Sequence, residues 1–389
     1  MNPTITNNCT TFAEDVITQD PQAEKPWILI HTPVNTVEEM MSVKWYLNMR
    51  MWTLILMLFT LSHVAHAELS IVHYERAYEL IYRDLHKENV KFKDIVFAIE
   101  NAYLGDEADY NTYCKEINRM ASALREQAKQ YAAYEPTEEM ALLRAISSCY
   151  IEPNEANRGK PFSYDMLPTL QRNYPHYGLV TKLLETGCGT CRSLPFLFKI
   201  LADELGVNAY ITLAPQHYFI SHKDAHGRWW HFETTIGRYL TSAAITELTE
   251  MHPTGIRTGL YMRPLREEDL MMICLNDLME AYFLRTGRYT DPFTRRCYTL
   301  GLLFYPNSML LTHLYNDKRT ILCERAQRAG IKDSIDLVHH PDFQQEYQYV
   351  ESIRERIKSI GYQEWTDTYL KRYMQRMRNY VNQHPNEFK

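Results

Sequence analysis

The sequence predicts an α+β fold, in which one helix packs on a small antiparallel sheet between an N-terminal helical lobe and an all-α C-terminal region. Apolar residues recur at helical spacing from about residue 74 to 150, and again from about residue 267 onward. Between these regions, short β-rich runs alternate with turn residues. Helices that are segregated from a short antiparallel sheet are typical of the α+β class.

The first 67 residues have the pattern of an extension and a targeting segment. Residues 1–39 are polar, which predicts a non-native or disordered extension. Residues 40–67 predict a secretory signal peptide, because an apolar stretch from Trp52 to Leu61 follows basic residues and ends in Ala65-His66-Ala67. This stretch is shorter than the roughly 20 residues that span a bilayer. We therefore expect an exported protein, periplasmic or extracellular, with no stable membrane anchor after cleavage.

Residues 68–160 predict the N-terminal helical lobe. Apolar side chains such as Ile95 and Ile99 recur three or four residues apart. The pattern is broken at Gly105 and at Pro136, which predicts separate helices joined by turns.

Cys191 lies where a further helix is predicted to begin. From Ser193 to Leu205 the apolar residues follow helical spacing, and Gly206 marks the end. Residues 166–185 are expected to be mainly helical and to lead into the turn before Cys191. The unpaired N–H groups and positive end of a helix stabilise an anion, so this position favours a thiolate nucleophile and offers amides to an oxyanion.

A β-hairpin is predicted directly after this helix. Its two runs, residues 209–222 and 228–234, are joined by a polar turn that ends in glycine. His217 and Glu233 are symmetric about Ala225. A hairpin centred on that residue places the two side chains directly opposite, with Cβ atoms roughly 4.5 to 5.5 Å apart.

This register predicts a catalytic triad. Glu233 accepts a hydrogen bond from one ring nitrogen of His217 and fixes its tautomer, which leaves the other nitrogen to take the proton of Cys191. Cys191 is then the nucleophile, His217 the general base and then acid, and Glu233 the residue that orients His217. Three further histidines are alternative candidates for the general base; they are His222, His226 and His231.

Residues 187–235 resemble the core of the transglutaminase-like superfamily, whose members carry a helix-starting Cys in a G-x-C context, a strand His and an Asp that ends the next strand. The matching residues are Gly189-Thr190-Cys191, His217 and Glu233. The resemblance covers about 50 residues well and about 90 loosely, the size of a domain core. It implies a papain-like core over residues 161–258 that acts without a metal or an organic cofactor.

Two departures from this family are visible. Glu233 stands where the family usually has Asp, and the family's upstream oxyanion residue has no obvious match. The candidates for that residue are Gln171, Asn173 and Tyr174. More narrowly, the GTCRSLPFLFKILADELG and APQHYFI segments look like a group of secreted bacterial transglutaminase-like proteins, a similarity that implies fold and site but no substrate.

Residues 259–389 predict an all-α region. Helix pairs with a Gly-x-Tyr turn and a following proline resemble degenerate tetratricopeptide (TPR) repeats, so these helices are expected either to bind a protein partner or to buttress the core. Residues 241–258 are expected to be a connector. The predicted helices are Asp269–Thr286, Pro292–Phe304, Ser308–Ala329, Phe343–Ile360 and Glu364–Val381.

Cys188 and Cys191 also form a C-x-x-C motif, which is the spacing of thiol oxidoreductases and of half a zinc site. A thioredoxin-type site expects a strand before the cysteines within a βαβ pattern, and a zinc site needs a second ligand pair. Neither context is evident in the sequence. Cys188 is therefore predicted to be structural, with a disulfide to Cys191 as a further hypothesis.

The composition narrows the function. A net charge of −6 offers no general attraction to nucleic acid or to anionic membranes. The signal pattern, the predicted triad and the resemblance together imply an exported transglutaminase-like cysteine hydrolase, a peptidase or amidase that acts on a peptide or protein substrate through a thioester; attack by an amine would make it an acyltransferase. The alternatives are a catalytically inactive transglutaminase-like or TPR-like binding module, and a C-x-x-C thiol-disulfide oxidoreductase.

Overall fold

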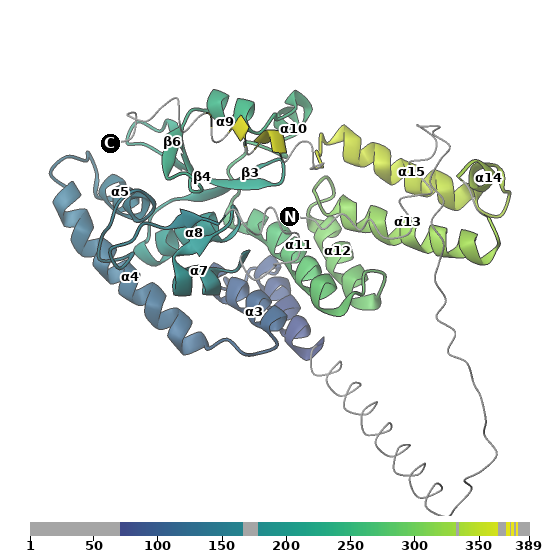
Figure 1. Ribbon diagram of the computed structural model, residues 1–389, viewed down its shortest axis with the longest axis horizontal. Coiled ribbons are helices and arrows are strands. Elements are labelled where there is room, and N and C mark those ends of the chain that lie inside the picture. The colour runs from purple at the N-terminus through teal and green to yellow at the C-terminus, as the bar shows by residue number, and fades with distance from the viewer. Residues whose placement is uncertain are drawn as a thin grey trace, which may run out of the picture.

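The computed structural model describes residues 71–165, 178–331, 334–364, 371–373, 375–376 and 379. Helices dominate the described part of the chain, and its strands form one four-stranded antiparallel sheet and one two-stranded parallel pair. The predicted α+β class is thus confirmed. In Figure 1 the blue N-terminal helices and the teal sheet occupy one end of the molecule, and the yellow-green C-terminal helices occupy the other.

Helices make up most of residues 71–151, as the periodicity predicts. They are a helix over residues 71–85, α3 (Phe92–Leu104), α4 (Tyr110–Tyr131) and α5 (Glu138–Ile151). Gly105 ends α3 in the left-handed conformation, with φ 77°. Asp109 and Thr137 cap the N-termini of α4 and α5, because their side chains accept hydrogen bonds from backbone N–H groups of the first turn.

The helix after Cys191 has the predicted bounds. α8 (Ser193–Leu205) ends at Gly206, which takes φ 73°. Before it lie α7 (Val180–Thr186) and a two-residue strand, β2 (Cys188–Gly189), which pairs in parallel with β1 (Ser163–Tyr164). The chain therefore enters α8 from a short strand, β2, that is paired with β1.

The antiparallel sheet has the strand order β3-β4-β5-β6. Its strands are β3 (Tyr210–Ala214), β4 (His217–Lys223), β5 (Trp229–Glu233) and β6 (Arg238–Leu240). The run over residues 209–222 was predicted as one arm of a single hairpin, and this is wrong. Pro215 and Gln216 form a tight turn, Gln216 takes φ 52°, and Ala214 pairs with His217. A proline followed by a left-handed residue reverses the chain, so the run becomes two strands.

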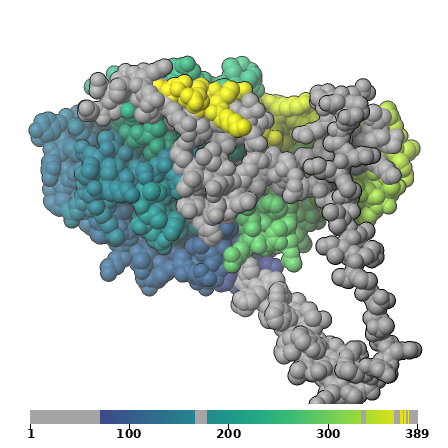
Figure 2. Space-filling view, in the orientation of Figure 1, coloured from purple at the N-terminus to yellow at the C-terminus, as the bar shows by residue number. Residues whose placement is uncertain are grey.

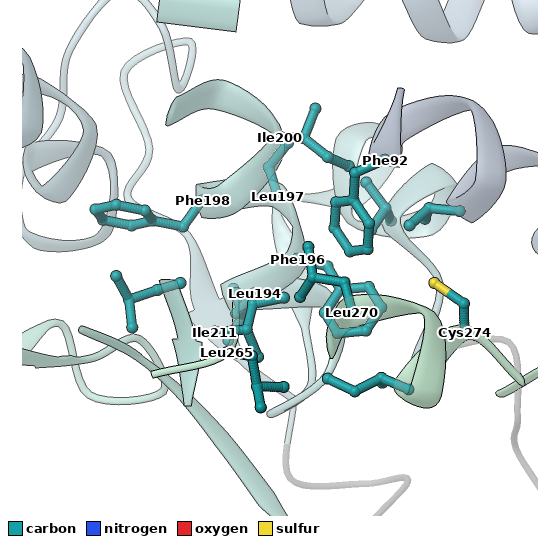
Figure 3. Close-up of a cluster of buried hydrophobic side chains, with 14 of the residues drawn as sticks. Phe92, Leu194, Phe196, Leu197, Phe198, Ile200, Ile211, Leu265, Leu270 and Cys274 are labelled. Carbon is teal, nitrogen blue, oxygen red and sulfur yellow. The ribbon is translucent and has the colours of Figure 1, made fainter. Parts of the chain in front are cut away.

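The hydrophobic core is centred on α8. This helix is buried around most of its circumference, and Figure 3 shows Phe198 and Ile200 pointing to opposite sides of it. Phe196 packs on Phe92 of α3 with ring centroids 5.4 Å apart. Burial of each such side chain contributes about 1.5 to 3 kcal/mol. A helix that is buried over most of its surface belongs in the interior, and Cys191 lies two residues before its start.

The segment from 241 to 258 was predicted as a connector, but it contains two short helices, α9 (Ser242–Leu248) and α10 (Pro253–Arg257). The side chains of Thr241 and His252 cap them. Both capping residues are present in the sequence. The segment was nevertheless predicted as a connector because it is polar and has little apolar periodicity.

The C-terminal region is helical, as predicted, and four of the five predicted helices lie within three residues of their expected bounds. The observed helices are α11 (Glu267–Thr286), α12 (Pro292–Phe304), α13 (Leu311–Arg328), α14 (Ser334–His339) and α15 (Gln344–Ser359). α11 and α12 belong to the main core, whereas α13, α14 and α15 share a second, smaller cluster around Leu322, Leu337 and Val350.

Several predictions fall outside the described residues. These are the extension over residues 1–39, the signal peptide over residues 40–67, the candidate oxyanion residues Gln171, Asn173 and Tyr174, and most of the predicted helix Glu364–Val381. Within the described part of the chain, no helix combines the length and the apolar character that a membrane crossing requires.

Candidate active site

Cys191 sits in the turn that opens α8, as predicted. The helical bonding begins with Leu194 N–H, which donates to the carbonyl of Thr190. Ser193 Oγ accepts a bond from Thr190 N–H at 2.9 Å and closes the turn. The thiol is 5% exposed, and its sulfur lies 4.0 Å from the carbonyl oxygen of Gln216. The first turn of α8 therefore directs Cys191 toward the β3–β4 turn.

The β4–β5 hairpin has a different register from the one predicted. Ile220 faces Phe232 and Ser221 faces His231, which centres the hairpin on residue 226 rather than on Ala225. His217 and Glu233 are therefore displaced by two residues along the strands instead of being directly opposite. A shift of two residues keeps both side chains on the same face, since side chains alternate with period two. Diagonal neighbours remain within reach of a long side chain.

His217 and Glu233 form the predicted pair. Nε2 of His217 lies 2.7 Å from Oε2 of Glu233, and the two residues are 1% and 3% exposed. The other carboxylate oxygen accepts bonds from the backbone N–H of Thr235 at 3.0 Å and from its hydroxyl at 2.7 Å. Both oxygens of Glu233 are thus engaged, which fixes the carboxylate against the imidazole.

The electrostatics of this pair favour its ionised form. Burial opposes a charge on His217, but the charge of Glu233 and the nearby thiol of Cys191 outweigh it and raise the pKa of His217 to about 10. Burial likewise opposes the charge of Glu233, whereas His217 and the bonds from Thr235 lower the pKa of Glu233 below its ordinary value. Both shifts favour an imidazolium beside a carboxylate.

The structure also brings Cys191 to His217. Cys191 lies near enough to His217 to contribute to the raised pKa of the imidazole, and because Nε2 faces Glu233, the nitrogen left for Cys191 is Nδ1. The hydroxyl of Tyr373 lies 3.4 Å from this same nitrogen. The three predicted residues therefore form one chain of contacts, with Tyr373 as a fourth member that the sequence did not indicate.

A buried ion network lies directly behind the nucleophile. The guanidinium of Arg192 donates to Asp277 of α11 at 2.7 Å and to Glu100 of α3 at 3.1 Å. Glu100 is fully buried and also accepts the first N–H groups of α7, from Val180 at 2.7 Å and from Thr181 at 2.9 Å. Arg192 thus joins three helices next to Cys191. The sequence shows a charged residue, Arg192, beside Cys191. It does not indicate the ion network, because the partners of Arg192 lie 92 and 85 residues away.

A small cavity adjoins His217. It has a volume of about 30 Å³, enough for one water-sized group. Its walls come from the β3–β4 turn, from the segment between α10 and α11, from α11 itself and from the segment after α15, and they include His217, Gln216, Glu280, Tyr261 and Tyr362. A larger cavity of about 400 Å³ lies between the end of α8 and the start of α11. None of the three triad residues lines that cavity, so it has no part in the proposed chemistry.

The competing histidines have other partners. His231 bonds the hydroxyls of Ser221 and Ser242, both at 2.8 Å, and His222 bonds the hydroxyl of Tyr239. His226 lies in the turn, with its backbone N–H bonded to Asp224. The structure therefore brings His217, and not these residues, to Cys191.

Cys188 lies apart from this chain of contacts. Its sulfur is 3.2 Å from the hydroxyl of Ser163, and both Cys188 and Cys191 are free thiols. Across the described residues, no group of three His, Cys, Asp or Glu side chains is arranged to hold a metal ion.

Comparison of the chain with protein-family models, with curated proteins and with solved structures gives no match. The case for a function therefore rests on the geometry of Cys191, His217 and Glu233.

Proposed function

We propose that the protein is a cysteine hydrolase with a transglutaminase-like core, which cleaves an amide bond of a peptide or protein through a thioester. The observation that carries this proposal is the single histidine, His217, which bonds Glu233 and lies beside Cys191 in a buried site. The same arrangement of nucleophile, histidine and orienting acid serves acyl transfer in cysteine enzymes.

The first half of the reaction forms the acyl-enzyme. The imidazolium of His217 stabilises a thiolate on Cys191, and this sulfur attacks the amide carbon of the substrate. The negative charge that develops on the carbonyl oxygen faces the N-terminal end of α8, whose amides and dipole are placed to stabilise it. His217 then gives its Nδ1 proton to the leaving nitrogen, the carbon–nitrogen bond breaks, and a thioester and a free amine result.

The second half restores the enzyme. Neutral His217 takes a proton from a water molecule, the oxygen attacks the thioester carbon, and Cys191 leaves as the thiolate with a carboxylic acid as product. An amine in place of the water would make the reaction an acyl transfer. Throughout both halves Glu233 keeps Nε2 of His217 engaged and stabilises the imidazolium each time it forms.

Reactivity of the thiol toward iodoacetamide tests this proposal. The purified protein is alkylated between about pH 4 and pH 9, and the modified cysteine is identified by peptide mass spectrometry. We expect Cys191 to react at acidic pH in the wild type and to lose this acidic reactivity in His217→Ala. His231→Ala is the matched control, because His231 is also a buried histidine of the sheet but bonds only serine hydroxyls.

Two outcomes would contradict the proposal. An identical pH profile in wild type and His217→Ala would mean that the histidine does not activate Cys191, and a binding module would then be the better explanation. Loss of turnover in Cys188→Ala, once a substrate is found, would favour the thiol oxidoreductase instead, since the hydrolase needs no second cysteine.

A further inference from the structure

The proposed site is closed in this structure. Cys191 is 5% exposed and His217 is 1% exposed. A peptide substrate cannot reach either side chain without displacing part of the protein. One described side chain that covers His217 is Tyr373, which comes from a segment 156 residues further along the chain.

Tyr373 occupies the reactive side of the histidine. Its hydroxyl lies 3.4 Å from Nδ1 of His217, the two rings are 5.6 Å apart, and the tyrosine is itself only 4% exposed. In the proposed reaction, Nδ1 is the atom that must meet the leaving nitrogen of a substrate. A bound substrate and Tyr373 therefore compete for the same space.

The residues on either side of Tyr373 are tied to the loop after α9. Arg372 contacts both carboxylate oxygens of Glu250, at 3.2 and 3.0 Å. Arg376 also pairs with Glu250, and it donates to the carbonyl of Leu248 at 3.1 Å. In Figure 2 some of the last described residues, in bright yellow, are visible on the outer surface. Tyr373 is thus buried, whereas its attachments are at the surface.

We propose that Arg372, Tyr373 and Arg376 form an autoinhibitory strap that closes the site over Cys191 and His217. The contacts that hold the strap in place are weak enough to break. Its ion pairs are partly exposed, with Glu250 35% and Arg372 55% exposed, and ion pairs of this kind are weak and screened by salt. Breaking them releases Arg372 and Arg376 from Glu250, so that Tyr373 can move and uncover Nδ1 of His217.

The rate at which iodoacetamide alkylates Cys191 in the full chain tests the strap. We expect Tyr373→Ala to raise this rate by about tenfold or more, and Glu250→Gln to raise it severalfold by releasing both arginines. Tyr373→Phe keeps the covering ring and should stay within about twofold of the wild type. About 0.5 M NaCl should accelerate the wild type but not Glu250→Gln.

Glu346→Gln is the matched control, because Glu346 pairs with Arg325 between α13 and α15, away from the site. Unchanged rates in both Tyr373→Ala and Glu250→Gln would overturn the proposal. An equal rise in Glu346→Gln would also overturn it, because general loosening would then explain the effect. Glu250→Gln alters only a partly exposed side chain, so it keeps the test decisive if Tyr373→Ala fails to fold.

The strap rests on the proposed function as the activity that it inhibits, but the experiment distinguishes the failure of one from the failure of the other. Uncovering the site multiplies the rate by the same factor at every pH, whereas activation by His217 changes the pH profile. A rate that rises in Tyr373→Ala, together with a profile that is unaffected by His217→Ala, would keep the strap and reject the hydrolase. An unchanged rate in Tyr373→Ala, together with a pH profile that His217→Ala alters, would support the hydrolase and reject the strap.

Discussion

At the scale of single residues, the length of Glu233 matters as much as its charge. The hairpin register places His217 and Glu233 diagonally, and the glutamate spans this offset to reach Nε2 at 2.7 Å. A direct cross-strand pair would suit a shorter acid, but a diagonal pair needs the additional methylene. The departure from the Asp of the transglutaminase-like pattern is therefore matched by the backbone geometry of this hairpin.

We accordingly expect Glu233→Asp to weaken the site. The shorter carboxylate loses its contact with His217, and alkylation of Cys191 at acidic pH should fall by about tenfold, the equivalent of one ordinary hydrogen bond to a charged group. Glu233→Gln keeps the length of the side chain and removes its charge. Comparison of the two variants therefore separates the effect of side-chain length from the effect of charge. Wild-type reactivity in Glu233→Asp would show that the diagonal offset imposes no length requirement.

At the scale of elements, Glu100 connects three helices to the nucleophile. It lies on α3, caps the start of α7 and pairs with Arg192 at the entry to α8. Both charges are desolvated, so each depends on the other for compensation. The position of Cys191 is thus determined by contacts behind the active site as well as within it.

Glu100→Gln should therefore be costly. It leaves Arg192 with an incomplete set of partners and weakens the cap on α7, and we expect a loss of about 3 kcal/mol in the free energy of unfolding. Urea denaturation measures this loss. Glu126→Gln on α4 is the control, because Glu126 forms an exposed pair with Lys129 and should change the stability by less than about 1 kcal/mol. Equal effects in the two variants would show that the network around Arg192 adds no particular stability.

At the scale of the whole molecule, one hydrophobic core joins regions that the sequence pattern separated. It includes Tyr74 near the start of the described chain, Phe198 in α8, Leu275 in α11 and Tyr373 in the strap. The site lies where these regions meet. The ionised pair at this site should consequently contribute to the stability of the whole domain.

This contribution should depend on pH in a definite direction. Glu233 and Cys191 raise the pKa of His217 from 6.5 to about 10, so the stabilisation is complete below about pH 6.5 and is lost as the pH rises toward 10. The pKa of Glu233 is lowered from 4.5, so its contribution is complete above about pH 4.5 and is lost at lower pH. The pair therefore stabilises the fold most between about pH 4.5 and 6.5.

Urea unfolding of the wild type and of His217→Gln, at about pH 5.5, 7.5 and 9.5, checks this prediction. The difference in free energy of unfolding between the two proteins should be largest at pH 5.5 and shrink steadily toward pH 9.5. The subtraction removes the titration of groups that the two proteins share. A difference that stays constant across this range would mean that His217 has the same pKa in the folded and the unfolded protein, and a difference that grows with pH would mean that His217 is neutral when folded.

The sequence by itself determined the local structure around the site. The apolar periodicity that ends at Gly206 was sufficient to predict the bounds of α8. These bounds in turn predict that Cys191 lies at the start of a helix. The pairing of His217 with Glu233 was also predictable, because a shift of two residues in register preserves the face on which both lie. Such features depend on residues that are close along the chain.

Only the tertiary structure decided how these parts meet. The left-handed Gln216 turns a predicted single arm into two strands, and the register of the next hairpin follows from turn geometry that composition does not specify. The partners of Arg192 lie 85 and 92 residues away, and Tyr373 lies 156 residues from His217. Ion pairing and burial act through space, so no local pattern around Cys191 indicates which distant side chains will hold and cover it.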